Sequence, residues 1–188
     1  SAWLAYLAFI VTGLASAAYL WPRTRNLTWD RLAGASAEVG VLFMGVTLVT
    51  GSLWGRLTWG TYWTWDSRLT TTAFLFVTYI GYLAVRDLGG THHQRARRSA
   101  VLALLSVLEV PLVHFSVVWW RPLHQGQSVR NNELENLMLF TLFLGLVVFT
   151  LLYVWLVMHR QRVLAMHDMV TERSLEAALA ERRREGTS

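Results

Sequence analysis

The chain of 188 residues contains no cysteine and no lysine, and only three prolines. Without cysteine it can form no disulfide, no thiolate metal site and no cysteine nucleophile. All 17 basic residues are arginine, and with 12 acidic residues they give a formal net charge of +5. These arginines lie between apolar runs and in a tail balanced by acidic residues. They are therefore not the basic patch of a nucleic-acid-binding protein.

Outside the segments that carry the arginines, charged residues are scarce and the chain consists of long apolar runs. Hydrophobic residues make up 54% of the chain and aromatic residues 13%. A helix of about 20 apolar residues rises about 1.5 Å per residue and so crosses a hydrocarbon core of about 30 Å. The alternating short strands of a membrane barrel are absent. The sequence predicts an all-α, polytopic transmembrane helical bundle with five spans, at about residues 1–20, 32–53, 68–85, 99–118 and 134–158.

The arginines also predict an orientation. Those of the 21–31 and 86–98 segments, with those of the tail after His159, outnumber the four at positions 56, 68, 121 and 130. The positive-inside rule therefore places the first group in the cytoplasm. We expect a membrane domain over residues 1–158 and a cytoplasmic helical tail over residues 159–188. Ser1 then lies outside, without a Met or a signal-peptide pattern, so we expect a preceding span and six spans in the intact protein.

One segment on the outer side is dominated by tryptophan. Residues 54–66 hold four indoles, a tyrosine and an aspartate between two apolar runs. Tryptophan also collects at membrane interfaces as a belt, but a belt requires only one or two residues per helix end. Four indoles in so short a stretch predict a flat aromatic surface that holds a flat ligand. The residues concerned are Trp54, Trp59, Tyr62, Trp63, Trp65 and Asp66.

The second outer loop carries a histidine in aromatic surroundings. His124 follows Trp119 and Trp120 and lies on the same side as the tryptophan segment. A neutral imidazole is a good axial ligand for haem iron, although a loop histidine is often only solvated. His114 lies within the fourth span, where a structural hydrogen bond and a direct ligand role both remain open. The other histidines, at positions 92, 93, 159 and 167, are expected to be solvated.

Two long motifs carry a resemblance to a known family. Trp-Gly-Thr-Tyr-Trp-Thr-Trp-Asp at 59–66 resembles the tryptophan-rich signature of haem-handling proteins of cytochrome c biogenesis. Val-His-Phe-Ser-Val-Val-Trp-Trp-Arg-Pro-Leu-His-Gln-Gly at 113–126 narrows the resemblance to the cytochrome c maturation protein C (CcmC) family. The resemblance implies a bacterial inner-membrane protein with a periplasmic tryptophan segment. It also implies delivery of haem b to the chaperone CcmE, with an ABC transporter of CcmA and CcmB and the small subunit CcmD.

The resemblance also implies site residues. His124 matches the second periplasmic haem ligand of the family, and the family's first ligand precedes the segment that begins at Ser1 and so is not in this chain. The platform for haem would comprise Trp54, Trp59, Trp63, Trp65 and Asp66, with Trp119 and Trp120 nearby. Arg56, Arg68 and Arg121 are placed to pair with haem propionates, or equally with lipid phosphates. Asp66, with Ser67, is also a candidate cap for the third span.

Two other function classes compete with haem delivery. An electron-transfer cytochrome b subunit needs histidine pairs that face each other within the bilayer, whereas only His114 lies inside a span. A haem transporter needs a polar path, for which Glu38, Glu109 and His114 are the candidates. No hydrolytic triad or phosphate-binding loop is visible in the sequence. We therefore expect a chain that is not itself an enzyme.

Overall fold

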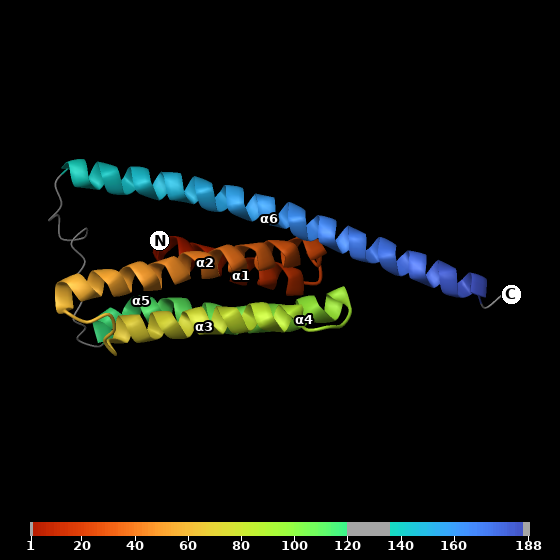
Figure 1. The fold of residues 1–188 in the computed structure, drawn as a ribbon, viewed down its shortest axis with the longest axis horizontal. Helices are drawn as coiled ribbons and strands as arrows, with labels where there is room; N and C mark the ends of the chain where they lie inside the picture. Colours follow the sequence, from red (N-terminus) through yellow and green to blue (C-terminus); the bar gives the residue numbers. More distant parts are fainter. Residues whose placement is uncertain (1, 120–135, 186–188) are drawn as a thin grey trace.

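The computed structural model describes residues 2–119 and 136–185, and these form helices joined by short connections. The described residues contain no strand, so the prediction of an all-α bundle is confirmed. Figure 1 shows a helical bundle and a long C-terminal helix that runs along it and continues beyond. The helices are α1 (Ala2–Leu20), α2 (Leu27–Trp59), α3 (Ser67–Asp87), α4 (His92–Val107), α5 (Glu109–Trp119) and α6 (Asn136–Glu185).

The bundle has two unlike ends. At one end α2 ends, α3 begins and α5 ends, and we call this the aromatic end because residues 54–66 lie there (Figure 1). At the other end α1 ends, α2 begins, α3 ends and α4 begins. We call this second end the charged end, because arginines and aspartates meet there. The second half of α6 passes it on the way to the C-terminus.

The predicted second span is longer in the structure. Asn26 caps α2 by accepting a hydrogen bond from the Thr28 backbone N–H at 3.1 Å. The helix then continues through 33 residues, or about 50 Å, to Trp59. It ends at Gly60, whose φ of 77° lies in the left-handed region that glycine adopts without strain. Half of the tryptophan segment is therefore helical, where a loop was expected.

The predicted fourth span is two helices rather than one. α4 ends at Val107 and α5 begins at Glu109, with Leu108 between them. Pro111 explains the break, because it has no N–H to donate to the Val107 carbonyl four residues earlier and its ring crowds that carbonyl. The other four predicted spans coincide with helices long and apolar enough to cross a membrane. Those helices are α1, α2, α3 from Leu69, and α6.

Small residues allow close helix packing in the core. Ala5 and Ala8 of α1 and Ala35 and Ala37 of α2 are buried in the core. A Cβ on Gly40 would lie 2.6 Å from the Phe9 ring, so only glycine fits at this crossing. Without a strong hydrophobic drive between helices in lipid, this close approach supplies the packing contacts that hold them together.

Polar contacts hold the helices together at the charged end. Arg86 on α3 donates two hydrogen bonds to the Asp30 carboxylate on α2, at 2.6 and 2.7 Å, and both residues are buried. The guanidinium lies against Gly34, where a Cβ would be only 2.5 Å from its Nε. Arg31 donates to Asp168 of α6 at 2.9 Å. These pairs join α2, α3 and α6.

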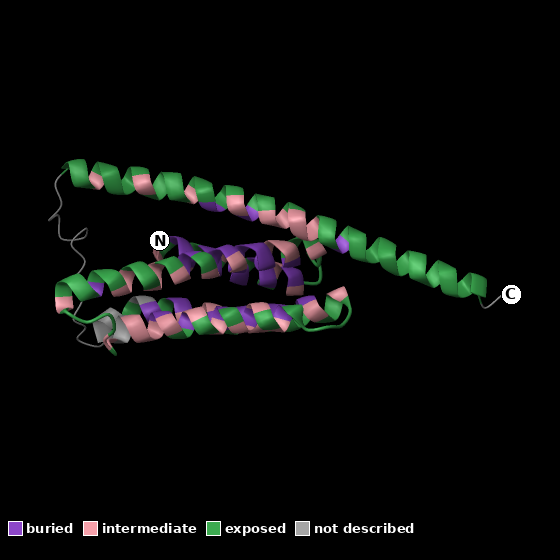
Figure 2. Cartoon of the chain, viewed as in Figure 1, coloured by how far each residue is buried: buried purple, intermediate pink, exposed green. Residues whose placement is uncertain are grey.

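The apolar part of α6 is more apolar than the other candidate membrane spans and is the least covered of them. Only 6% of its most apolar window is buried, against 50% for α1. Figure 2 shows the helix exposed along most of its length. Its attachment is local: Tyr153 shares a hydrogen bond of 2.7 Å with Ser36, and Arg160 donates to Glu38. α6 runs without a break through residues 158 and 159, so the expected domain boundary coincides with no change in secondary structure.

Candidate functional site

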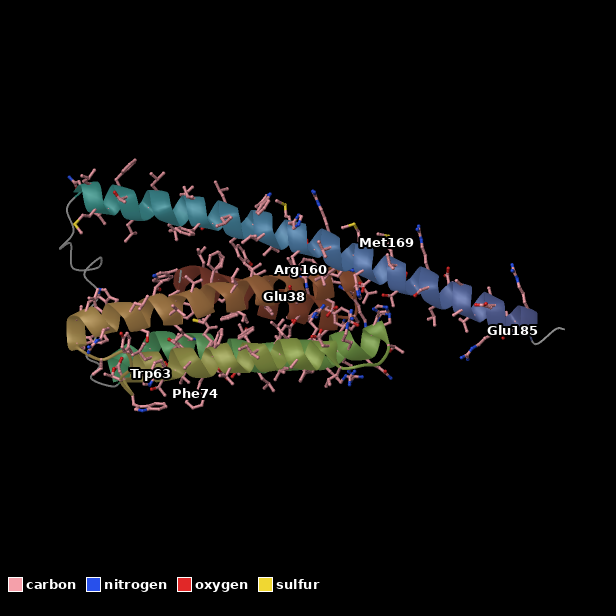
Figure 3. The ribbon with its side chains drawn as sticks, in the orientation of Figure 1. Glu38, Trp63, Phe74, Arg160, Met169 and Glu185 are labelled. Atoms are coloured by element: carbon pink, nitrogen blue, oxygen red, sulfur yellow. The ribbon has the colours of Figure 1, made fainter. Side chains whose placement is uncertain are left out.

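The tryptophan segment spans the turn from α2 to α3. Trp54 and Trp59 lie on the last turns of α2, whereas Trp63 and Trp65 lie in the connection that follows Gly60. Figure 3 shows Trp63 at the aromatic end, away from the pair formed by Glu38 and Arg160. The turn at Gly60 therefore brings the second pair of indoles back toward the end of the helix that carries the first pair.

Two polar side chains of α2 hold this connection in place. Ser52 and Arg56 are four residues apart and so lie on one face of the helix. Ser52 donates to the Tyr62 carbonyl at 2.5 Å, and Arg56 donates to the Gly60 carbonyl. The Arg56 guanidinium also lies over the Tyr62 ring, 5.5 Å from its centre. The loop is thus tied to the helix by its own neighbours.

The indoles pack in two edge-to-face pairs. Trp54 and Trp59 have ring centres 5.3 Å apart at 80°, and Trp63 and Trp65 have centres 5.8 Å apart at 83°. The flat surface expected from the sequence is therefore wrong for both pairs, because aromatic quadrupoles favour this perpendicular contact over a coplanar one. Each pair forms a corner, and one indole of each pair is clearly exposed. Trp65 is 82% exposed and Trp54 is 49% exposed.

The polar candidates of the segment have particular roles. Asp66 occupies the N-cap position of α3 as predicted, and its backbone carbonyl accepts the Thr70 N–H at 2.9 Å. Its side chain makes no capping hydrogen bond, so the predicted mechanism of the cap is wrong. The Thr64 hydroxyl oxygen is buried and has no hydrogen-bond partner among the described residues.

Several predicted site residues cannot be placed by side chain. His124, Trp120 and Arg121 lie outside the described residues. Arg68 lies in α3 and His114 and Trp119 lie in α5, but their side chains are also outside the described part. The backbone still contributes one fact. α5 ends at Trp119 at the aromatic end, where the tryptophan segment also lies (Figure 1).

Two of the remaining histidines, and the two glutamates of the candidate haem path, have partners in the structure. The Nδ1 atom of His93 lies 3.0 Å from the Tyr19 hydroxyl, and the His159 ring stacks on Trp155. Both histidines are nevertheless exposed, so these contacts add to the predicted solvated roles and do not replace them. Glu109 accepts a hydrogen bond from Thr78 at 3.1 Å.

Glu38, by contrast, pairs with Arg160 between α2 and α6. Glu38 and Glu109 were the acidic candidates for a polar haem path. Glu109 thus links α5 to α3, whereas Glu38 links α2 to α6. Within the part of the chain that the structure describes, no three histidine or acidic side chains are grouped to hold a metal ion.

Sequence reasoning missed the buried pair of Asp30 and Arg86. Both residues stand at the borders of the predicted spans, where charges are usually solvated. The signal was present in Gly34, one helical turn after Asp30, which leaves room for the guanidinium. No pattern in the α3 sequence indicates that Arg86 turns inward, so this contact required the structure.

Comparison with known proteins decides the family. A family model described as heme exporter protein C (CcmC) matches residues 1–177, which include both the tryptophan segment and the segment with His124. The chain belongs to the CcmC family. The resemblance carried by the two sequence motifs is therefore confirmed.

Individual relatives agree with this family. Heme exporter protein C of Bradyrhizobium diazoefficiens is 40% identical over 160 residues, which cover 83% of this chain and 60% of that protein. The protein of the same name from Haemophilus influenzae is 40% identical over 132 residues, which cover 69% of this chain and 54% of that protein. A putative cytochrome c biosynthesis ccmC-like mitochondrial protein of Arabidopsis thaliana is 35% identical, over 68% of this chain and 47% of that protein.

The overlap with these CcmC proteins has a limit. The chain spans about half to three fifths of the length of the curated relatives that it matches. What the family membership establishes here is kinship and a helical membrane fold. The activity and the partners of a whole CcmC protein are matters for a proposal.

Proposed function

We propose that this chain binds haem b as a cargo at its tryptophan segment and passes it to the haem chaperone CcmE during cytochrome c maturation. The observation that carries the proposal is the tethered, exposed set of indoles at one end of an apolar bundle. A surface that holds a ligand briefly needs apolar area that is open to a partner. The aromatic end supplies this area, and CcmC membership makes haem the expected cargo.

The edge-to-face pairs suit a planar ligand in a specific way. A porphyrin can stack on the exposed face of one indole and meet the edge of its partner at the corner. Each Å² of apolar surface removed from water would contribute about 25 cal/mol. Because Trp65 and Trp54 remain open in the structure, haem bound to them would stay accessible to a second protein. This is the requirement of a delivery site.

His124 is the proposed iron ligand. It follows Trp119 so closely that the connecting chain spans at most about 18 Å, at about 3.6 Å per residue. Trp119 ends α5 at the aromatic end, and this short separation along the chain supports His124 as a ligand for haem held by the indoles. His114 is the alternative ligand. Arg56, Arg68 and Arg121 are the proposed partners of the haem propionates, and Arg56 has N–H groups besides those used on the loop.

The surroundings of the site follow from the same proposal. The arginine distribution places the aromatic end on the periplasmic side of the bacterial inner membrane and α6 past His159 in the cytoplasm. The chain carries no group for nucleotide hydrolysis, so we assign it a non-catalytic role. Energy would come from CcmA and CcmB, with CcmD as a further subunit of the complex.

The test is a visible absorption spectrum of the full-length protein purified in detergent. We expect a haem Soret band that shifts or weakens in His124→Ala and is unchanged in His167→Ala, which alters an exposed tail histidine. An unchanged spectrum in His124→Ala with a changed one in His114→Ala would overturn the outer site and favour an embedded cytochrome. Absence of haem from the wild-type protein after haem is supplied would overturn the cargo assignment.

Delivery is tested separately from binding. The haem-loaded protein is mixed with apo-CcmE, the two are separated, and haem in each is quantified. We expect haem to move to CcmE from the wild-type protein. Retention of all haem by a protein that binds it normally would overturn the transfer step and leave the binding site intact.

A further inference from the structure

A cavity lies at the charged end, far from the indoles. It has a volume of about 310 Å³ and is lined by Leu20, Arg25 and Arg97. We propose that this cavity binds the phosphate group of an anionic phospholipid. The site is independent of haem, so either proposal can fail without the other.

Arg25 is held in position by an aromatic support. Its guanidinium carbon lies 5.8 Å from the centre of the Tyr19 ring, within the range of a cation–π contact. Tyr19 is itself 1% exposed, and its hydroxyl is 3.0 Å from the Nδ1 atom of His93 on α4. The ring is thus fixed between two helices. Arg25 therefore loses less freedom on binding an anion than an unsupported surface arginine does.

Arg97 is brought to the same cavity by small residues on α4. Ala96 and Ala100 are buried against Tyr19, with Leu20 packed beside them. Their short side chains let α4 lie close to the end of α1. Arg97 follows Ala96 in the sequence, and together with Arg25 it lines the cavity.

Unlike Arg31 and Arg86, Arg25 and Arg97 have no acid to neutralise them among the described residues. Arg86 is bound to Asp30 and Arg31 to Asp168, which commits the buried carboxylates of the charged end. Within residues 2–119 and 136–185, neither Arg25 nor Arg97 has an ion pair or a hydrogen bond. Two like charges beside one cavity repel each other, so an anion between them is stabilising.

The shape and position favour a lipid phosphate over a soluble one. Guanidinium groups match phosphate oxygens in two-pronged contacts. Leu20 adds an apolar wall, which suits the glycerol and upper acyl region of a lipid but offers nothing to inorganic phosphate. Leu20 is also the last residue of α1, and Trp21 beside it is 63% exposed, as is usual for an indole at the membrane interface.

The test compares retained lipids in the full-length protein. Protein is reconstituted with phosphatidylglycerol and phosphatidylcholine, extracted into detergent, and analysed by native mass spectrometry. We expect one retained phosphatidylglycerol in the wild type and about tenfold less retention in R25Q/R97Q, because both charge-assisted contacts are lost. The control R162Q/R173Q removes the same charge from exposed arginines of α6 and should retain the lipid.

Three results would overturn the proposal. The first is that R25Q/R97Q retains the lipid as the wild type does. The second is that R162Q/R173Q loses the lipid equally, which would mean that only the net charge of the protein matters. A modest excess of inorganic phosphate could displace the lipid, which would make the site one for soluble phosphate. Both Arg25 and Arg97 are exposed, so we expect the double variant to fold normally. The single variants R25Q and R97Q should each lose part of the retained lipid, which distinguishes weaker binding from misfolding.

Discussion

The charged end and the aromatic end of the same bundle are held in opposite ways. At the charged end, contacts join helices far apart in the sequence, as between Asp30 and Arg86 or between Arg31 and Asp168. At the aromatic end, the described contacts are local: Ser52 and Arg56 bond carbonyls of the loop that follows their own helix. The indole side chains of Trp54 and Trp65 are exposed.

This difference teaches how one small bundle can combine rigidity with an open surface. Long-range polar contacts fix the relative positions of α2, α3 and α6 at the charged end. The aromatic end then needs only enough local structure to present its indoles. A ligand-binding surface is usually drawn from the less stable part of a fold, because binding and release require exposed groups.

The largest effect is expected from breaking the charged end with Arg86→Leu. Asp30 would be left buried without its partner, which costs about 3–5 kcal/mol of the free energy of unfolding. Unfolding by sodium dodecyl sulfate in mixed micelles measures this loss. The double variant Asp30→Leu/Arg86→Met should recover most of the stability, and Arg162→Leu serves as an exposed control. A loss in Arg86→Leu no greater than in the control would contradict a buried ion pair.

The complementary change removes two indoles from the aromatic end, with Trp63→Ala/Trp65→Ala. We expect haem affinity to fall about tenfold, equivalent to about 1.4 kcal/mol of lost stacking and apolar contact. Stability should change by less than about 0.5 kcal/mol, because these rings cover no core. Haem titration and unfolding are measured on the same preparation. Trp21→Ala, at the opposite end, should bind haem normally. An equal loss of haem affinity in Trp21→Ala would contradict the assignment of haem binding to the tryptophan segment.

A smaller effect is expected where α6 meets α2. Tyr153→Phe deletes one buried hydrogen bond to Ser36, worth about 1 kcal/mol of the free energy of unfolding. The effect is limited because Ser36 also donates to the Ala8 carbonyl. The same unfolding assay applies, with Tyr62→Phe at the exposed aromatic end as the control. Equal stability of the two variants would show that the contact between Ser36 and Tyr153 does not hold α6.

The smallest effect is expected from Glu38→Gln. The Arg160 and Glu38 side chains are 42% and 32% exposed, so solvent weakens their attraction to about 0–1 kcal/mol. What loss there is should shrink as salt is raised, because partly exposed pairs are screened. Unfolding at low and high ionic strength measures the difference. A large loss in the free energy of unfolding that does not depend on salt would mean that this pair belongs to the rigid part of the charged end.

Much of the fold was predictable because membranes constrain sequence strongly. Every backbone group in hydrocarbon must be bonded internally, so apolar runs of helical length predict helices directly. Pro111 was visible in the fourth run, and its effect on the Val107 carbonyl is local chemistry. The length of α2 was less predictable. Trp54 and Trp59 are not typical of a loop or of a helix, and only the turn at Gly60 marks where the helix ends.

The candidate site was predictable in composition but not in geometry. The sequence places Trp54, Trp59, Trp63 and Trp65 together, since they are close along the chain. It does not specify the angle between rings, which depends on how the loop is tied to Ser52 and Arg56. The edge-to-face pairs follow from that tie. His124 remains a sequence prediction.

The sequence by itself determined the helical membrane fold, the CcmC family and the position of the tryptophan segment, because all three depend on residues close together in the chain. Only the tertiary structure decided which charges are paired. Arg86, Arg25 and Arg97 look alike in the sequence, yet one is buried against Asp30 and two line an open cavity. The physical reason is that electrostatic partners are chosen by distance in space, and helix packing sets that distance.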